Sequence, residues 1–423
     1  MIDRHDDLTR REFLTGSAAL VAGIGAFGVF TEARGDKIGP NDIINAAIIG
    51  TGSQGCSLLG KAVKVPNVRF VACCDIQEKN LAKGLSIAKG AKGFKDYRQL
   101  LDSKDVRAVI VAVPLNLHAP ITIDALRAGK HVLCEKMMAY SIDDAKQMLR
   151  VARETGLKLQ IGHQRRYDPN YRHAYKLVKD GVLGKITHVR AQWNRNGSWR
   201  RPCPDPKLDE LINWRMYRKC SQGLMAELGS HQLDVVNWML GDTPSAVMGV
   251  GGIDYWKDGR EVYDNVQCIF EYPSGTKLQY QSLTTNQYDG FAEQFMGDKG
   301  TLVISTNRAL LFREPKAEQL VWAEMAHKET LGGKEGIVLH ASKTPKPRVA
   351  EQQTEDLKIG ADDKAKKDDY LLELEDFFLS IRDGHEPFCS PRVALDTCVA
   401  SIKANEAMET LKRVEIPAEA YRA

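Results

Sequence analysis

Residues 44–75 read INAAIIGTGSQGCSLLGKAVKVPNVRFVACCD, and this stretch decides the fold. An apolar run meets Gly50, Gly52 and Gly55 in the order GxGxxG. A helix-like segment follows, and a second apolar run ends at Asp75, 20 residues after Gly55. A strand, a tight turn, a helix and a strand in this order form the unit that binds a dinucleotide. Gly50 permits the turn, Gly52 lets backbone amides approach the pyrophosphate, and Gly55 lets the helix pack on the strand.

The acidic residue at the end of the second run indicates which dinucleotide binds. Asp75 is placed to accept hydrogen bonds from a ribose 2′-hydroxyl, and its charge would repel a 2′-phosphate. A lone GxGxxG also occurs in loops that bind nothing, but here both flanking strands and the acid stand at the expected distances. We therefore expect NAD rather than NADP. The contacts expected from this stretch are Gly50, Gly52, Ser53, Gln54, Gly55 and Asp75.

The composition excludes several classes of protein. The chain has 423 residues, of which 43% are hydrophobic and 27% charged. This composition is typical of a globular protein, and the length is sufficient for two hydrophobic cores. A net charge of +4, with no Lys/Arg stripe interleaved with aromatics, argues against nucleic acid as a partner. The nine cysteines form no CxxC pair and no zinc pattern, so we expect core thiols and no bound metal.

The first 34 residues resemble a twin-arginine export signal. TRREFL at residues 9–14 precedes an Ala/Gly-rich apolar stretch, residues 17–30, that is too short to span a bilayer comfortably. An amphipathic first helix is the alternative, but the four glycines between residues 16 and 28 disfavour it. We expect a periplasmic or exported protein that has no membrane span after the signal is removed.

Residues 43–163 alternate short apolar runs with helical periodicity, which is typical of a doubly wound parallel sheet. Beyond the opening unit, strands are expected at residues 108–113, 131–134 and 158–161, and helices at 119–128 and 142–155. The sequence therefore predicts an N-terminal Rossmann domain over residues 43–163.

Residues 164–423 follow a different pattern. Strand-like runs separated by turn residues predict an α+β domain with a large open, mainly antiparallel sheet, covered by helices on one face. Its strands are expected at residues 186–193, 247–255, 266–272, 277–285 and 300–304, and its helices at 173–179, 370–382 and 393–411. The Lys/Asp-rich residues 342–369 predict a charged loop.

A second group of residues suggests catalysis. Lys136 follows a predicted strand, and ligands bind at the carboxyl ends of parallel strands, which would place Lys136 over the nicotinamide. Glu227 and His231 lie four residues apart in an apolar segment, so in a helix they would share one face. A carboxylate there can orient the imidazole and raise its pKa. The alternative is a surface pair or a satisfied buried pair without a role in catalysis.

Together these motifs resemble the Gfo/Idh/MocA oxidoreductases, the family of glucose–fructose oxidoreductase and inositol dehydrogenase. The resemblance runs from about residue 45 to 417 and rests on GTGSQG, VPLNLHAP, Glu135-Lys136, GHQRRYDP, Trp214-Arg215 and ELGSHQLD followed by WMLG. It implies NAD(P), a sugar or polyol substrate, and a homodimer or homotetramer. It also implies that Lys136 is the catalytic lysine, that His231 exchanges the substrate proton, and that Glu227 replaces an aspartate. The further cofactor contacts that it implies are Pro114, Asn116, His118, Glu135 and Lys136.

The sequence departs from the family pattern in two places. Met137 follows the lysine where the family commonly has proline, and Glu227 is one methylene longer than Asp. Substrate contacts are expected from the segment at residues 163–167, which strand-end packing could equally explain. They are also expected from the loop after residue 193, rich in donors and flat rings, which a subunit contact could equally explain, and from Trp214-Arg215. These candidates are His163, Arg166, Tyr167, Trp193, Arg195, Trp214 and Arg215, with Arg165 in the first segment.

The mechanism expected from these residues is hydride transfer from a sugar or polyol hydroxyl. His231 would act as the base, Lys136 would bind the same oxygen, and Glu227 would orient His231 or a neighbouring hydroxyl. Because export removes the enzyme from a pool of NAD, a retained cofactor is expected. The alternatives are a redox-neutral NAD-dependent glycosidase and, from another class, a sugar-binding protein without catalysis.

Overall fold

The computed structural model describes residues 42–305, 308–339 and 368–423. The predicted export signal at residues 1–34 lies outside these residues. So does the predicted charged loop, apart from its last two residues, of which Asp369 already belongs to a helix. In the described ranges, no helix has both the length and the apolar character needed to cross a bilayer.

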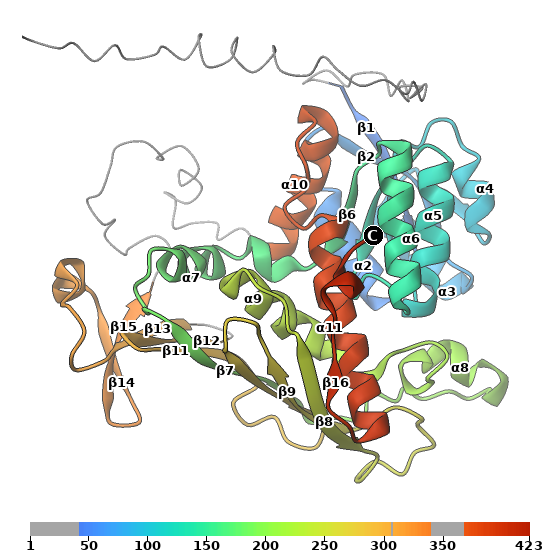
Figure 1. The fold of residues 1–423 in the computed structure, drawn as a ribbon. Coiled ribbons are helices and arrows are strands. Elements are labelled where there is room, and N and C mark those ends of the chain that lie inside the picture. The colour runs from blue at the N-terminus through green and yellow to red at the C-terminus, as the bar shows by residue number, and fades with distance from the viewer. Residues whose placement is uncertain (1–41, 306–307, 340–367) are drawn as a thin grey trace, which may run out of the picture. The chain divides into compact units, whose positions relative to one another are not determined.

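The N-terminal part is built on a six-stranded parallel sheet in the order β3-β2-β1-β4-β5-β6. Figure 1 labels β1, β2 and β6 of this sheet. Every residue of β4 is buried, as expected of a strand covered on both faces. The order reverses between β1 and β4, so this is the predicted Rossmann arrangement. The strands are β1 (Ile44–Ile49), β2 (Val68–Cys74), β3 (Lys92–Phe94), β4 (Ala108–Val111), β5 (His131–Glu135) and β6 (Leu159–Gly162).

Helices cover both faces of this sheet, and one of them comes from the far end of the chain. α10 (Asp369–Asp383) packs beside α2 (Ser53–Ala62), and its Phe378 meets Phe70 of β2 edge to face, with ring centroids 6.5 Å apart. The C-terminal part therefore completes the core of the Rossmann sheet. The remaining helices here are α3 (Glu78–Ile87), α4 (Tyr97–Leu101), α5 (His118–Arg127) and α6 (Ile142–Thr155).

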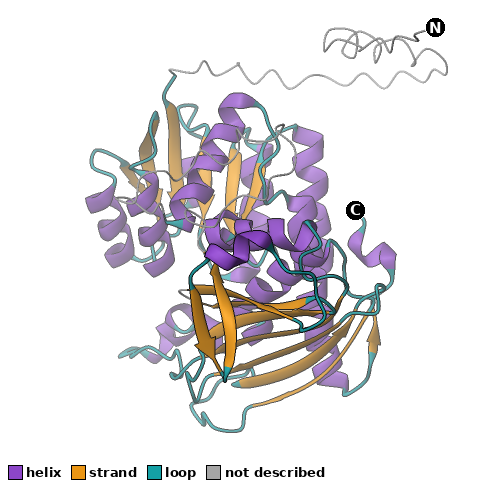
Figure 2. Cartoon of the chain, turned by 90° about the vertical axis from the view of Figure 1, so that its left-hand side faces the viewer, coloured by secondary structure: helices purple, strands orange, loops and turns teal. Residues whose placement is uncertain are grey.

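The second sheet has ten strands in the order β14-β15-β13-β12-β11-β7-β10-β9-β8-β16, and only β7 and β10 pair in parallel. Burial alternates along β9, because one face packs on helices. The predicted fold class, an α/β chain with an open, mainly antiparallel second sheet, is confirmed (Figure 2). The strands are β7 (Ile186–Asn194), β8 (Ala246–Gly252), β9 (Asn265–Glu271), β10 (Lys277–Leu283), β11 (Phe291–Gly297), β12 (Gly300–Ser305), β13 (Arg308–Arg313), β14 (Lys328–Leu331), β15 (Lys334–Leu339) and β16 (Val414–Glu415).

Three long helices and several short turns complete the described chain. The long helices are α7 (Pro169–Lys179), α9 (Ser230–Leu240) and α11 (Pro391–Thr410). The short elements are η1 (Leu115–Leu117), η2 (Gln164–Tyr167), η3 (Pro206–Leu208), α8 (Asp209–Ile212), η4 (Trp214–Met216), η6 (Val321–Met325), η7 (Ala418–Tyr421) and η5 (Met225–Gly229), which is a π-helix.

The sequence prediction missed the short strands β3 and β16 and the strands β11, β13, β14 and β15. In β11 the buried, inward-facing position that should be apolar holds Glu293, which hides the alternation of the strand. The prediction also made β8 too long, since it continued to residue 255. The strand ends at Gly252 because Asp264 accepts the backbone N–H groups of residues 254–256, which turns the chain out of the sheet.

Candidate active site

The glycine turn between β1 and α2 leaves open space beside a helix N-terminus. Gly50 has φ +93°, and a Cβ on it would lie 2.2 Å from the backbone oxygen of Ala112. A Cβ on Gly55 would lie 1.9 Å from the oxygen of Gly50, whereas a Cβ on Gly52 would meet no atom within 4 Å. The first turn of α2 carries no acidic residue and no side-chain cap, so its N–H groups face this space. Such a site fits a pyrophosphate.

Asp75 stands at the end of β2, next to this turn. One carboxylate oxygen accepts from the backbone N–H of Thr51 at 2.9 Å, and the other accepts from that of Gln77 at 2.8 Å. These bonds fix the carboxylate at the edge of the turn. The first oxygen also accepts from the Thr51 hydroxyl at 3.4 Å, while the second keeps a lone pair. The residues present thus fit NAD, with the phosphates on α2 and a ribose on Asp75.

Gln54 links the glycine helix to the end of β5. Its amide donates to Glu135 at 2.7 Å, and the backbone N–H of Lys136 donates to the other oxygen of Glu135 at 3.1 Å. Burial raises the pKa of Glu135, although Lys136 and Gln54 oppose the change. Ser53 opens α2 one residue before Gln54. The two ends of the expected cofactor site are therefore held together by one buried carboxyl group.

Of the cofactor contacts expected in the segment after β4, one has a side chain left for a ligand and another does not. Pro114 precedes η1, and the side-chain oxygen of Asn116 in η1 is buried without a hydrogen-bond partner within residues 42–305, 308–339 and 368–423. The ring of His118 is buried between the backbone oxygens of Met137, at 2.8 Å, and Val113, at 3.0 Å. His118 therefore holds the chain that carries Lys136 and offers no free ring nitrogen to a cofactor.

Lys136 reaches across from the Rossmann sheet to the second part of the chain. Its Nζ donates to the backbone oxygen of Glu227 at 2.9 Å, and the Lys136–Met137 peptide bond is cis. Burial lowers the pKa of Lys136, while the charges of Glu227 and Glu135 act in the opposite direction. An ammonium held at this strand end can donate a hydrogen bond to a substrate oxygen.

Glu227 does not pair with His231, so this expectation was wrong. Its carboxylate accepts from Nε of Arg215 at 2.8 Å and from the hydroxyl of Ser221 at 3.2 Å. The reason is local, because Glu227 lies in the π-helix η5, whose wider turn does not stack residues four apart as an α-helix does. Burial alone would raise the pKa of Glu227, but Arg215 and Lys136 outweigh it and lower that pKa.

His231 is the second residue of α9 and lies in a buried setting that favours its neutral form. Its ring centroid lies 5.1 Å from that of Trp193 and 6.5 Å from that of His163. The pKa of His231 falls well below its usual value because of burial first, then the charges of Lys136 and Arg165. The expected rise in this pKa was therefore also wrong. A neutral imidazole beside an ammonium is nevertheless the form in which a histidine can accept a proton.

His163 lies behind His231 and is neutral for the same reason. Burial lowers its pKa to about 4, with Asp234 opposing and Arg166 adding to the change. Both ring nitrogens are buried without a hydrogen-bond partner in the described part of the chain. His163 thus has two ring nitrogens left for a ligand or for bound water.

Two family models match along the chain. Residues 44–163 match the oxidoreductase family, NAD-binding Rossmann fold, of Gfo/Idh/MocA, and residues 171–303 match the Gfo/Idh/MocA C-terminal domain. The 2,7-anhydro-N-acetylneuraminate hydratase of Mediterraneibacter gnavus is 34% identical over 267 residues, covering 62% of this chain and 67% of that protein. The chain belongs to the Gfo/Idh/MocA family. Its N-terminal part is an NAD-binding Rossmann domain.

Other relatives agree with this family. The inositol 2-dehydrogenase of Rubrobacter xylanophilus is 29% identical over 272 residues, covering 63% of this chain and 72% of that protein. The crystal structure of an aldose–aldose oxidoreductase from Caulobacter crescentus, complexed with glycerol, is similar with a TM-score of 0.68 and 22% identity. The similarity covers 88% of this chain and all of that one, and it shows a shared fold.

Arg165 and Glu293 form a buried ion pair that the sequence did not predict. Nη1 of Arg165 donates to Glu293 at 2.6 Å, and the hydroxyl of Tyr171 donates to the other oxygen at 2.8 Å. The Arg165 guanidinium carbon lies 4.9 Å from the ring centre of Trp193 and 4.1 Å from that of Phe291. Glu293 lies in β11, a strand that the sequence prediction missed, at a position that no motif marks.

Arg166 and Tyr167, which were expected to contact substrate, instead bond to other side chains inside the protein. Arg166 makes a two-pronged ion pair with Asp234, with N–O distances of 2.8–3.0 Å, and the side chains of both residues are buried. The hydroxyl of Tyr167 donates to Asp376 of α10 at 2.8 Å. These polar groups are used inside the protein, so the pair braces η2 behind His163 and does not offer free donors to a sugar.

The remaining substrate candidates lie on two neighbouring segments. Trp193 belongs to β7 and contacts His231, while Arg195 follows the strand with its guanidinium 5.3 Å from the ring centre of Trp199. Trp214 lies under Arg215, whose guanidinium is 4.1 Å from its ring centre. The structure therefore brings Trp193 to the histidine and links Trp214, through Arg215, to Glu227.

Proposed function

We propose that this protein is an NAD-dependent oxidoreductase acting on a CH–OH group of a sugar or polyol, with a retained cofactor and no net redox change. The observation that carries the proposal is the reaction centre at the end of β5. There Lys136, a neutral His231 and an ionised Glu227 meet beside the glycine turn. Family membership supports oxidoreductase chemistry, and the relatives named for inositol and aldoses support the substrate class.

The residues divide the work according to their charge. Bound NAD supplies the hydride acceptor. His231 takes the proton of the substrate hydroxyl, since its lowered pKa leaves the imidazole free to accept it. Lys136 donates a hydrogen bond to the same oxygen as negative charge develops there. Glu227 acts through Lys136 and Arg215, because its negative charge opposes the lowering of the Lys136 pKa that burial causes.

Export motivates the retained cofactor. The paired arginines of TRREFL support twin-arginine export to the periplasm, where no pool of NAD would replace a spent molecule. A retained cofactor must regain its starting state in every cycle. The names of two relatives, an aldose–aldose oxidoreductase and a hydratase, describe reactions without net redox change, which supports this reading.

A second candidate is a redox-neutral glycosidase that uses the same residues. Transient oxidation of the sugar acidifies the neighbouring C–H, elimination releases the aglycone, and addition of water followed by reduction completes the hydrolysis. The hydratase relative favours this candidate because its name describes water addition on an anhydro sugar. A sugar-binding protein without catalysis is the weakest candidate, since Asp75, Lys136 and His231 are all present.

We also propose a homodimer or homotetramer, formed through the face of the large sheet that the helices do not cover. Met248 and Val250 of β8 and Ile269 of β9 are exposed, and Met248 pairs directly with Ile269. Exposed apolar side chains gathered on neighbouring strands are typical of a subunit interface. Sedimentation of the mature protein would give the number of subunits.

The deciding experiment omits the cofactor. The purified protein should convert many equivalents of sugar without added NAD, and acid denaturation should release a nicotinamide dinucleotide that mass spectrometry identifies. Release of aglycone from a nitrophenyl glycoside without a second sugar would favour the glycosidase. Strict dependence on added NAD, with stoichiometric NADH, would contradict both redox-neutral readings and leave an ordinary dehydrogenase.

A further inference from the structure

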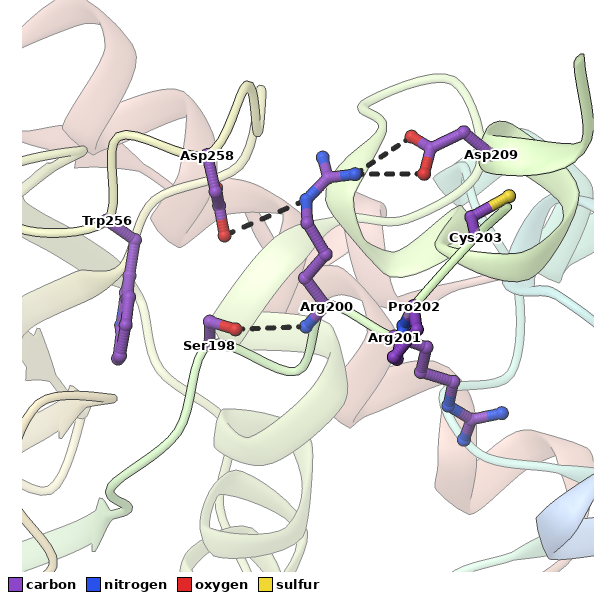
Figure 3. A pocket seen from close by; sticks show the side chains of 8 residues that line it. All are labelled: Ser198, Arg200, Arg201, Pro202, Cys203, Asp209, Trp256 and Asp258. Carbon is purple, nitrogen blue, oxygen red and sulfur yellow. Dashed lines mark hydrogen bonds and ion pairs between the residues drawn. The ribbon is translucent and has the colours of Figure 1, made fainter. Parts of the chain in front are cut away.

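A cavity of about 510 Å³ lies between the segment that joins β7 to α8 and the segment that joins β8 to β9 (Figure 3). Lys136, Glu227 and His231 are not among its lining residues. The side chains that define its chemistry are Ser198, Arg200, Arg201, Asp209, Trp256 and Asp258.

Trp256 forms one wall and is held rigidly. Its ring N–H donates to Thr284 at 3.0 Å, and its backbone N–H donates at 2.9 Å to Asp264, which is 1% exposed. Figure 3 shows the ring edge-on, with one face turned toward the side where Ser198 and Arg200 lie. A fixed, partly exposed indole offers flat apolar area at little cost in conformational entropy.

The two aspartates of the lining are paired with arginines. Arg200 pairs with both oxygens of Asp209, at 3.0 and 2.9 Å, and its Nε lies 3.8 Å from Asp258. Arg260, which lies behind the lining, donates to both oxygens of Asp258 at 2.9 and 2.7 Å, so each aspartate of the lining is paired with an arginine. The hydroxyl of Ser198 and the remaining lone pairs of Asp258 can serve hydroxyl groups. An aromatic face opposite neutralised polar groups suits a neutral, polyhydroxylated ring rather than a phosphate.

The cavity wall is joined to the reaction centre by a short segment. The Asn213 side chain accepts from the backbone N–H of Arg201 at 2.7 Å and donates to Asp209 at 2.8 Å. Two residues further on, Arg215 donates to Glu227 at 2.8 Å. The cavity wall is thus linked through residues 213–215 to Glu227, whose backbone oxygen accepts from Lys136.

We propose that this cavity is a subsite for a second, neutral sugar ring of the substrate. The substrate would then be a glycoside with at least two sugar units, with one unit at Lys136 and His231 and the next against Trp256. The proposal rests on the proposed action on sugars, but it assigns a site and a substrate length that the reaction centre alone does not.

The test compares the binding and turnover of one-ring and two-ring sugars by the wild-type protein and by two variants. The probes are methyl glucoside and the methyl glycosides of maltose, cellobiose and lactose, with calorimetric affinity and kcat/KM as readouts. Trp256→Ala should weaken binding of the preferred disaccharide about tenfold or more and leave the monosaccharide unchanged. Trp322→Ala is the control, because it removes a tryptophan ring from η6, away from the cavity lining. It should change neither the monosaccharide nor the disaccharide affinity.

Arg201→Trp is an independent test because the side chain is exposed and the substitution adds bulk at the cavity wall. It should also lower disaccharide affinity alone. Equal loss for both ligands in Trp256→Ala, equal wild-type affinity for one ring and two, or no binding of any probe would overturn the subsite. Disaccharide binding that depends on Trp256, without turnover of any sugar, would keep the subsite and overturn the proposed activity.

Discussion

The glycine turn and the reaction centre lie at the same edge of the Rossmann sheet but are built from different material. The turn uses backbone N–H groups and the open space beside Gly52. The reaction centre uses buried side chains that would be costly to bury alone, namely Lys136, Glu227 and His231. The glycine turn needs only the local conformation of a few consecutive residues, whereas the reaction centre needs side chains from distant parts of the sequence.

This difference separates binding from chemistry. Changes in the glycine turn should alter cofactor affinity at unchanged folding, while changes in the reaction centre should alter turnover or the pH dependence of stability. Each of the following experiments tests that separation.

The largest effect is expected for His231→Ala. Loss of a general base typically lowers the rate by about 10²–10⁴-fold, while the cofactor site at Asp75 and the glycines is untouched. Turnover and NAD affinity should be measured together, with His188→Ala on the exposed side of β7 as control. Normal turnover would show that His231 is not the base and make Lys136 the leading candidate.

The role of the glycine turn in binding phosphate can be tested with two Gly→Ala variants, one at the start of α2 and one inside it. A Cβ meets no protein atom at Gly52 or at Gly60 of α2, so both alanine variants should fold. Only at Gly52 would the methyl group occupy the expected pyrophosphate space, and NAD should then bind about 10–100-fold more weakly. Fluorescence titration would measure this. Equal affinities in the two variants would place the phosphates elsewhere.

The buried His163 should make folding stability depend on pH. Its pKa is about 4 in the folded protein and about 6.5 when unfolded, so its stabilising contribution is present above pH 6.5 and is lost as the pH falls toward 4. At pH 5 the loss should be about 2 kcal/mol. Denaturant unfolding at pH 7 and 5 should show a smaller difference for His163→Gln than for the wild type. His188→Gln should behave like the wild type.

The smallest effect concerns the choice of cofactor. Asp75→Ala removes the expected acceptor of the ribose hydroxyl and the charge that repels a 2′-phosphate. The preference for NAD over NADP should narrow about tenfold. Asp102→Ala, which removes an exposed carboxylate after α4, is the control. Tighter NADP binding by the wild-type protein would contradict the assignment of Asp75.

The sequence alone determined the Rossmann unit, the family and the positions of Lys136 and His231, because glycine spacing, apolar periodicity and short motifs are local properties of the chain. Tertiary structure decided the partners. Glu227 turned to Arg215 because a π-helix replaced the expected α-helical spacing. His231 became neutral because burial and the charges of Lys136 and Arg165 all lower its pKa. The pair Arg165–Glu293 spans 128 residues, and no local pattern encodes such a contact. Buried charges find partners through the packing of sheets and helices, which exists only after the chain has folded.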